Sequence, residues 1–371
     1  MRRRHKLQAG GPAVLLLEED VRQALRSLLS AHRLDAVVVT KEVNLHYFSG
    51  FRRDDTTLVI TQDKAFIVTD SRYTEQAKQQ APEFTLVEQK DGLLKKTAEV
   101  LAQEDARAIG FEGNAMIFDT YAKLRELLKG RTFETPLCLD TLRQIKDEGE
   151  IAMIRKACEI ADAAFDDVIH YMKAGMTEID VAAHMESFMR AHGSEGPSFT
   201  TIMASGVRGA LPHGVATDKV IEDGEFVTMD YGAIYGGYHS DITRTVVIGK
   251  PSDRQRELYD AVLEAQKYAL TLIRPGASGK DVDAKVRAKL QEHDLGFGHG
   301  LGHCVGLEIH EEPRLSPKST CESLQPGIVI TDEPGVYIPG FGGLRIEDTV
   351  LVTPDGCEPL TKADKNLVEI H

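Results

Sequence analysis

Apolar and polar positions follow two different patterns along the chain, and the change falls near residue 140. Before it, short apolar runs such as "LDAVVVT", "AFIVTD" and "ARAIGFEG" predict buried strands. Segments with helical periodicity separate them, among them "TEQAKQQA", "LLKKTAEVLAQ" and "MIFDTYAKLRELLKG", the last expected to be capped by Gly130. This alternation of strands and helices predicts a small α/β domain over residues 1–140.

Residues 141–371 are organised differently. A charged segment, "RQIKDEGE", precedes a long helical pattern that starts at "IAMIRKACEI". The periodicity predicts further helices and strands, at 180–192, 254–273 and 279–292 and at 225–231, 240–248, 327–333 and 344–352, respectively. Because these helices and strands do not alternate regularly, the pattern predicts an α+β domain.

Size, charge and cysteine content narrow the class of protein. The 371 residues are enough for two domains, and the net charge of −14 disfavours nucleic acid and anionic membranes as partners. No apolar run approaches the roughly 18 residues of a membrane span, and the run at residues 12–17 is too short for a secretory signal. Five scattered cysteines without a CxxC motif predict reduced thiols and a cytoplasmic protein.

The stretch "MDYGAIYGGYHSDIT" carries two aspartates, Asp230 and Asp241, within strand-like sequence. If Gly236 and Gly237 form the turn of a β-hairpin, Asp241 faces Gly232 and shares one face of the hairpin with Asp230. The two Cα atoms then lie about 7–8 Å apart on a diagonal, which is close enough for both carboxylates to reach one cation. The alternative is a pair of solvated aspartates, which the apolar neighbours on both sides oppose.

A second pair of acids and a group of histidines extend this pattern. Glu333 and Glu347 interrupt the apolar segment "VITDEPGVYIPGFGGLRIEDTVLV", and "GHGLGHCVGLEIHEEP" places His299, His303 and His310 among glycines. A single histidine is more often structural, but three in a glycine-rich segment favour a site. Buried acids need compensating charge, and several carboxylates exceed what one ion uses. We therefore predict a two-metal hydrolytic site.

These residues resemble, in type and order, the five metal ligands of the "pita-bread" metallopeptidases: Asp230, Asp241, His303, Glu333 and Glu347. The "PHG" motif around His213 and the seven-residue step from His303 to His310 resemble the catalytic histidines of that family. The preceding α/β domain is similar to that of the Xaa-Pro branch (prolidase, aminopeptidase P and creatinase). Methionine aminopeptidases lack this domain, and creatinase lacks the metal ligands.

The resemblance implies an α+β pita-bread domain preceded by a creatinase-type N-terminal domain that serves substrate access or dimerisation. It also implies two divalent ions per subunit and a homodimer. Mixed oxygen and nitrogen ligands suit manganese, cobalt, zinc or iron, and we expect manganese or zinc. In the family pattern Asp230 binds the first metal, Asp241 and Glu347 bridge both, and His303 and Glu333 complete the second.

The same resemblance assigns catalytic roles. Glu333 accepts a proton from the attacking water, His310 stabilises the oxyanion, and His213 positions the substrate. His299 resembles a histidine that lines the proline pocket, although a structural hydrogen bond in the glycine-rich turn is an equal alternative.

The expected substrates are short peptides with proline in the second position. A dipeptide ends in a carboxylate directly after proline, so a dipeptidase benefits from basic residues there. Arg314, Arg345, Arg52 and Arg53 are the candidates, and together they favour an Xaa-Pro dipeptidase, or prolidase. The alternatives are an aminopeptidase P that cleaves longer Xaa-Pro-Yaa peptides and, more remotely, a non-catalytic peptide-binding module.

Overall fold

The computed structural model describes residues 19–53 and 55–371. The chain divides into two compact units, one that ends at Arg143 and one that begins at Gln144. The N-terminal segment for which we predict no secretory signal lies outside the described residues. Within the described part of the chain, no helix combines the length and the apolar character needed to cross a membrane.

The first unit is built on a six-stranded sheet of order β4-β3-β2-β1-β5-β6, with parallel and antiparallel neighbours. Its strands are β1 (Ala36–Val39), β2 (Thr57–Thr61), β3 (Ala65–Thr69), β4 (Thr85–Glu88), β5 (Ala108–Glu112) and β6 (Thr132–Leu137). Its helices are α1 (Glu19–Ala31), α2 (Glu42–Ser49), α3 (Thr74–Gln80), α4 (Leu93–Gln103), α5 (Phe118–Leu127) and the 3-10 helix η1 (Leu139–Arg143). The strands and helices predicted for this region are all present, and six further elements are additional: α1, α2, η1, β2, β4 and β6.

The position of β1 in the middle of the sheet explains why its sequence is apolar throughout. All four of its residues are buried, and they alternate between the two hydrophobic clusters on opposite faces of the sheet. A strand covered on both faces has no polar side, so its pattern is a continuous apolar run. One prediction here is wrong: α5 is capped at Leu128, and Gly130, with φ 86°, lies two residues beyond the cap.

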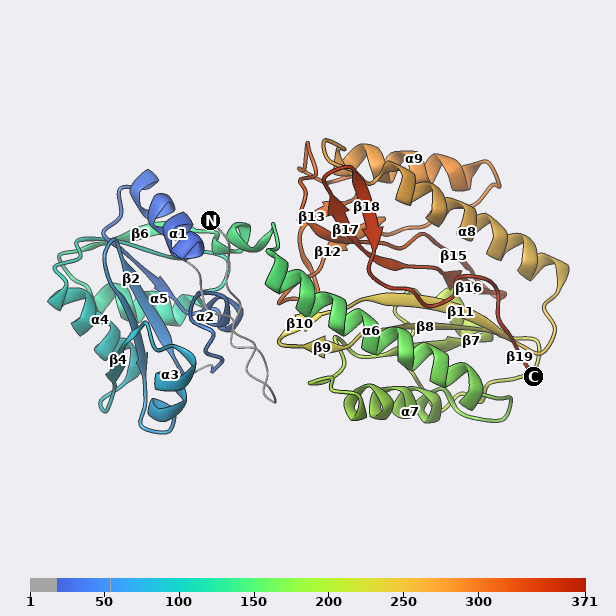
Figure 1. Ribbon diagram of the computed structural model, residues 1–371, viewed down its shortest axis with the longest axis horizontal. Helices are drawn as coiled ribbons and strands as arrows, with labels where there is room; N and C mark the ends of the chain where they lie inside the picture. Colours follow the sequence, from blue (N-terminus) through green and yellow to red (C-terminus); the bar gives the residue numbers. More distant parts are fainter. Residues whose placement is uncertain (1–18, 54) are drawn as a thin grey trace. The chain divides into compact units, whose positions relative to one another are not determined.

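The second unit contains four long helices and two main sheets (Figure 1). The helices are α6 (Glu148–Tyr171), α7 (Glu178–Ala191), α8 (Asp253–Leu272), α9 (Gly279–Gln291) and the 3-10 helix η2 (Gly206–Ala210). The four-stranded sheet, β19-β11-β8-β7, consists of β7 (Ile202–Ser205), β8 (Phe226–Tyr231), β11 (Ile242–Ile248) and β19 (Glu369–Ile370). The five-stranded sheet, β13-β12-β14-β17-β18, consists of β12 (Gly302–Cys304), β13 (Glu311–Leu315), β14 (Val329–Asp332), β17 (Asp348–Thr353) and β18 (Gly356–Pro359). Two short hairpins complete the unit, β9 (Ile234–Tyr235) with β10 (Tyr238–His239) and β15 (Gly335–Ile338) with β16 (Gly342–Arg345).

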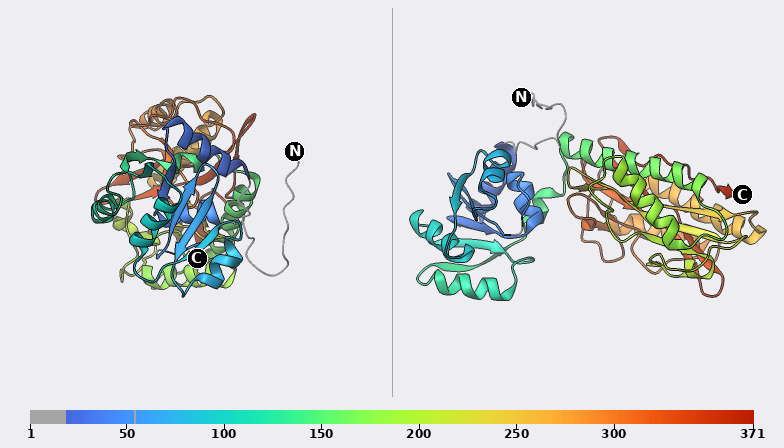
Figure 2. Two further views of the ribbon diagram at one scale, coloured as in Figure 1. Left: turned by 90° about the vertical axis from the view of Figure 1, so that its left-hand side faces the viewer. Right: turned by 90° about the horizontal axis from the view of Figure 1, so that it is seen from below.

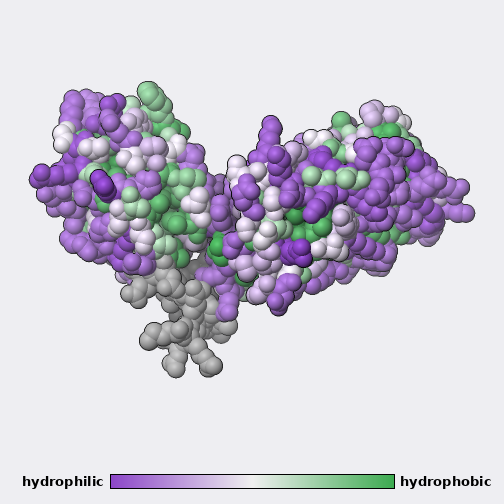
Figure 3. Space-filling model, turned by 90° about the horizontal axis from the view of Figure 1, so that it is seen from above, coloured by the Kyte–Doolittle hydropathy of each residue, from purple (hydrophilic) through white to green (hydrophobic). Residues whose placement is uncertain are grey.

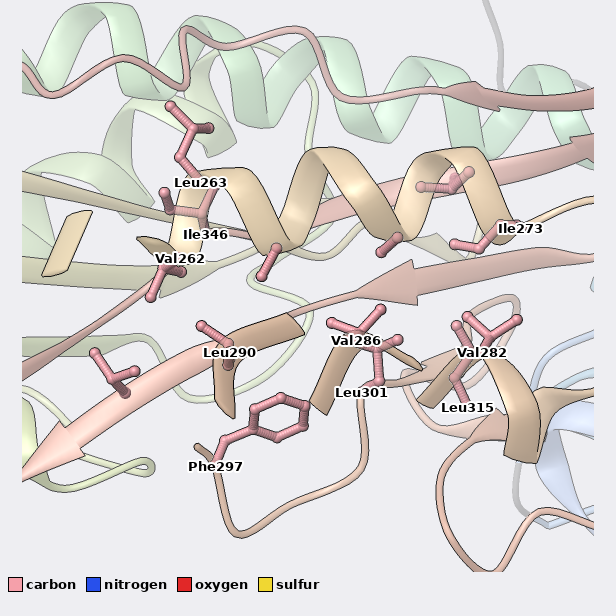
Figure 4. Packing of buried hydrophobic residues seen from close by; sticks show 14 of the residues in the cluster. Val262, Leu263, Ile273, Val282, Val286, Leu290, Phe297, Leu301, Leu315 and Ile346 are labelled. Carbon is pink, nitrogen blue, oxygen red and sulfur yellow. The ribbon is translucent and has the colours of Figure 1, made fainter. Parts of the chain in front are cut away.

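Each main sheet packs against its own pair of helices. Helices α6 and α7 cover the four-stranded sheet, and Figure 2 shows them side by side in green on one face of the unit. Helices α8 and α9 cover the five-stranded sheet, where Val262, Val286 and Leu290 pack with Leu315 and Ile346 (Figure 4). Figure 3 looks onto the side of α8 and α9 and shows a mainly hydrophilic surface, as expected of helices whose apolar faces turn inward. The predicted α+β class is confirmed.

The predicted strand at 344–352 is instead two strands. Strand β16 ends at Arg345 and pairs with β15, whereas β17 begins at Asp348 and pairs with β14. Between them, Glu347 forms an isolated β-bridge with Thr243 at the start of β11. The break therefore brings Glu347 from the five-stranded sheet to the four-stranded sheet.

Candidate metal centre

The hairpin that carries the two aspartates has the predicted register. Gly236 and Gly237 have φ values of 56° and 83°, as a two-residue turn of this kind requires, and β9 pairs with β10 directly across them. The same register continues between β8 and β11, where Thr243 is opposite Asp230. Asp230 and Asp241 therefore share one face of the hairpin, and the prediction is confirmed.

Three carboxylates meet on that face. Oxygen atoms of Asp230, Asp241 and Glu347 all lie within 4.8 Å of one another. The three residues are 8%, 4% and 2% exposed, respectively. Glu347 is fixed by its backbone, since its N–H donates to the carbonyl of Thr243 at 3.1 Å. Thr243 also donates its hydroxyl to Glu347 Oε2 at 2.5 Å, so the position of this carboxylate is well defined.

His303 and Glu333 join this group from the five-stranded sheet. His303 Nε2 lies 3.4 Å from Asp241 Oδ2 and 3.6 Å from Glu333 Oε1. The other ring nitrogen, Nδ1, donates to the carbonyl of Cys304 at 3.1 Å. Burial lowers the pKa of His303 to about 3, so the imidazole is neutral and its Nε2 lone pair faces two carboxylates. Such an arrangement is stable only with a cation or a proton between the three groups.

A cavity of about 1070 Å³ opens onto the carboxylate cluster. Ten of the residues predicted for the site line it: Asp230, Asp241, His303, Glu333, Glu347, His213, His299, His310, Arg314 and Arg345. All ten belong to the second unit. Arg52 and Arg53 belong to the first unit, so their closure over the site stays a prediction.

Arg345 lies within the cluster rather than at its edge. The residue is 3% exposed, and its guanidinium group donates to Asp230 and to the hydroxyls of Thr243, at 3.0 Å, and Tyr337, at 2.8 Å. Its positive charge therefore offsets part of the negative charge of the acids. The predicted role of Arg345 in binding substrate stays a prediction.

His299 is held by both of its ring nitrogens. Tyr337 accepts a hydrogen bond from Arg345, which leaves its own hydroxyl proton to donate to His299 Nε2 at 2.9 Å. His299 Nδ1 then donates to the carbonyl of Gly300 at 2.7 Å. Burial lowers the pKa of His299 to about 4, so the ring is neutral. Both nitrogens are therefore occupied by hydrogen bonds within the protein, and His299 lines the cavity with a neutral ring.

Sequence reasoning missed two residues that order the site, Thr243 and Tyr337. Thr243 follows Asp241 by two positions, so strand alternation places both on one face and was a usable signal. Tyr337 gave no comparable signal, because its contacts with His299 and Arg345 depend on the hairpin of β15 and β16.

The donor set fits divalent metal ions. Asp230 Oδ1 is buried without a hydrogen-bond partner in the described part of the protein, although a buried carboxylate oxygen needs one. Burial raises the pKa of Asp230, and burial together with neighbouring acids raises the pKa values of Asp241 and Glu347 well above their usual range. Metal ligands lie about 2.0–2.2 Å from an ion, so the separations of 3.4 and 3.6 Å at His303 match donors that share one ion.

Metal binding is expected to release protons. Burial raises the pKa of Glu333 to about 8 in the metal-free protein, so at pH 7 this carboxyl carries a proton that a metal ion must displace. We expect metal affinity to rise with pH up to about 8. Calorimetric titration of the metal-free protein in two buffers of different ionisation enthalpy measures the release, and identical heats in both buffers would contradict this expectation.

Comparison with known proteins agrees with this geometry. Residues 152–354 match metallopeptidase family M24, and residues 22–145 match the Creatinase/Prolidase N-terminal domain. The chain is 41% identical over 354 residues to the Xaa-Pro dipeptidase of Pyrococcus furiosus, which covers 93% of this chain and 99% of that protein.

Solved structures are similar over nearly the whole chain. An Xaa-Pro dipeptidase from Bacillus anthracis superposes with a TM-score of 0.91 at 40% identity, covering 94% of this chain and 99% of that one. An X-Pro aminopeptidase from Thermotoga maritima superposes with a TM-score of 0.87 at 37% identity, covering 91% and 98%. The resemblance found in the sequence is therefore confirmed: the chain belongs to metallopeptidase family M24 and carries a Creatinase/Prolidase N-terminal domain ahead of its peptidase domain.

Proposed function

We propose that this metal-dependent exopeptidase hydrolyses the Xaa-Pro bond of dipeptides. The observation that carries the proposal is the convergence of four carboxylates and one neutral imidazole in a single cavity. The similarity to proteins named Xaa-Pro dipeptidase, at about 40% identity over most of the chain, supports the substrate class.

The metal-binding roles follow from the donor set. Asp230, Asp241, His303, Glu333 and Glu347 would hold two divalent ions, with Asp241 and Glu347 shared between them. Mixed oxygen and nitrogen ligands suit manganese or zinc, and also cobalt or iron. Such a pair of ions supplies Lewis-acid polarisation of the scissile carbonyl and an acidified water.

The chain's own groups carry the proton and stabilise charge. Glu333, which lines the cavity 3.6 Å from His303 and would lose its proton when metal binds, accepts the proton of the attacking water. His310 lines the cavity with its ring centroid 4.3 Å from that of His303, so it can donate a hydrogen bond to the developing oxyanion. His213 positions the peptide from the η2 side, and the ring of His299 packs against proline.

The cavity also has basic side chains that suit the carboxylate of a dipeptide. Arg314 and Lys318 line it, and both residues are exposed. Arg314 pairs only with the neighbouring Glu312, at 3.1 Å, within the described residues, so its charge is available to substrate. These two positive charges favour a dipeptide, because its terminal carboxylate directly follows proline. A longer peptide has no charge at that point. The alternative, cleavage of Xaa-Pro-Yaa peptides, is supported by the similarity to an X-Pro aminopeptidase.

Location and assembly complete the proposal. The five cysteines are free thiols, which supports a reducing cytoplasm. The family resemblance supports a homodimer. Neither property changes the assignment of residues in the cavity.

A two-substrate assay tests the proposed function. We expect kcat/KM for an Xaa-Pro dipeptide to exceed that for the matched Xaa-Pro-Yaa tripeptide by about tenfold or more, because a salt bridge to the terminal carboxylate is lost in the tripeptide. Met-Ala serves as the control, since a methionine aminopeptidase would cleave it. Equal or reversed rates for the two proline peptides would replace the dipeptidase with an aminopeptidase P.

A further inference from the structure

The loop between β12 and β13, residues 305–310, carries His310 to the cavity. Within the described part of the chain, the ring of His310 makes no hydrogen bond to the protein, in contrast to His299 and His303. Its nitrogens are thus available to substrate, and the position of the ring depends on the backbone that carries it. The contacts of this loop therefore determine where His310 lies.

Glu311, the residue after His310, stabilises this loop through its buried carboxylate. Glu311 Oε2 lies 2.9 Å from Lys146 Nζ, and the two side chains are 5% and 1% exposed. Glu311 Oε1 accepts the backbone N–H of Glu308, within the same loop, at 3.2 Å. A Cβ on Gly306 would lie 2.6 Å from Glu311 Oε2, so only glycine lets the loop fold this closely around the carboxylate.

Lys146 is itself fixed in place. Its backbone N–H donates to the carbonyl of Gly327 at 2.8 Å, just ahead of β14. The next residue, Asp147, begins α6 with a capping box, in which its side chain accepts the N–H of Glu150 and the side chain of Glu150 accepts its N–H. The ammonium group therefore reaches Glu311 from a rigid segment that precedes α6.

A buried ion pair of this kind needs a reason other than stability. Removing two charges from water is costly, and a hydrophobic pair of similar volume often stabilises a fold equally well. The pair Lys146–Glu311 adjoins His310, whose ring, unlike those of His299 and His303, makes no hydrogen bond to the described residues. We propose that Lys146 and Glu311 are positioning residues that hold the 305–310 loop so that His310 reaches the oxyanion.

This inference rests on the proposed function, and a double-mutant cycle tests it separately. We expect Lys146→Met and Glu311→Gln each to lower kcat for an Xaa-Pro dipeptide by about tenfold to a hundredfold, with KM little changed, because displacement of a catalytic group by about 1 Å has that effect. In a His310→Ala background, Lys146→Met should cause no further loss. Bound metal should stay at the wild-type level, because neither substitution alters a metal ligand or a residue of the two hydrophobic clusters of this unit.

A merely structural pair would give a different result. An equal further loss in the His310→Ala background would overturn the proposal. If a single variant fails to fold, the double variant Lys146→Met/Glu311→Met removes both buried charges together. Reduced kcat in a folded double variant supports the proposal, and wild-type kcat overturns it.

Arg155→Met is the matched control. Arg155 pairs with Glu358 at 2.8 Å in the same unit, away from the cavity, so this variant should retain wild-type kcat. A wild-type protein that leaves Xaa-Pro dipeptides intact would refute the proposed function instead.

Discussion

Asp241→Asn is expected to lower kcat/KM for Xaa-Pro dipeptides by at least about 10³-fold, because the metal pair contributes several kcal/mol of transition-state stabilisation. Asp241 lies within reach of both halves of the donor set, near Asp230 and Glu347 on one side and 3.4 Å from His303 on the other. An amide in its place has no negative charge and turns N–H donors toward neighbouring ligands. The variant should therefore bind less metal, which elemental analysis of the purified protein measures together with the rate.

The matched control is Asp218→Asn, at an exposed aspartate outside the cavity, which should keep the wild-type rate and metal content. Exhaustive chelation of the wild type should give the same loss as Asp241→Asn, with recovery when manganese or zinc is restored. A chelated protein that still cleaves the proline bond, or a fully active Asp241→Asn variant, would refute the metal centre.

His310→Ala is expected to lower kcat by about 10² to 10³-fold, the usual effect of removing one oxyanion donor. KM should change little, because the hydrogen bond forms mainly in the transition state. His310 does not contact the carboxylate oxygens through any described hydrogen bond, so the variant should bind a full complement of metal. Steady-state kinetics and metal analysis of one preparation therefore distinguish the loss of an oxyanion donor, which lowers kcat alone, from the loss of a metal ligand, which also lowers metal content.

His293→Ala provides the control for this substitution. His293 lies after α9, is 44% exposed at its side chain and pairs with Glu264 at 3.6 Å, outside the cavity. Its loss should leave kcat unchanged. If His310→Ala changes only KM, His310 binds the peptide rather than the oxyanion, and the assignment of the donor must move to another group in the cavity, with His213 as the next candidate.

Local rules were sufficient for the first half of the site. A Gly-Gly turn fixes the register of a hairpin, and a side-chain period of two then fixes which residues share a face. For this reason the shared face of Asp230 and Asp241 could be predicted without a structure. The same local reasoning located α4, α7, α8 and α9 to within about two residues.

Contacts between distant segments could not be predicted in this way. The segment 344–352 reads as one strand because apolar and β-branched residues recur along its whole length, and nothing in that pattern shows that β16 and β17 join different sheets. The bridge from Glu347 to Thr243 depends on that break. The ion pair of Lys146 with Glu311 spans 165 positions, and only the folded chain reveals it. Resemblance to a family supplied the ligand set before the geometry was known.

The origin of the ligands in two sheets has a mechanical consequence. Asp230 lies in, and Asp241 directly before, a strand of the layer that packs on α6 and α7. His303 lies in a strand of the layer that packs on α8 and α9, and Glu333 and Glu347 directly flank two other strands of it. Ions held by ligands from both layers would link the two layers to each other. A substitution that loosens one hydrophobic core would then change metal occupancy. Substitutions far from the cavity can therefore alter catalysis without changing a metal ligand.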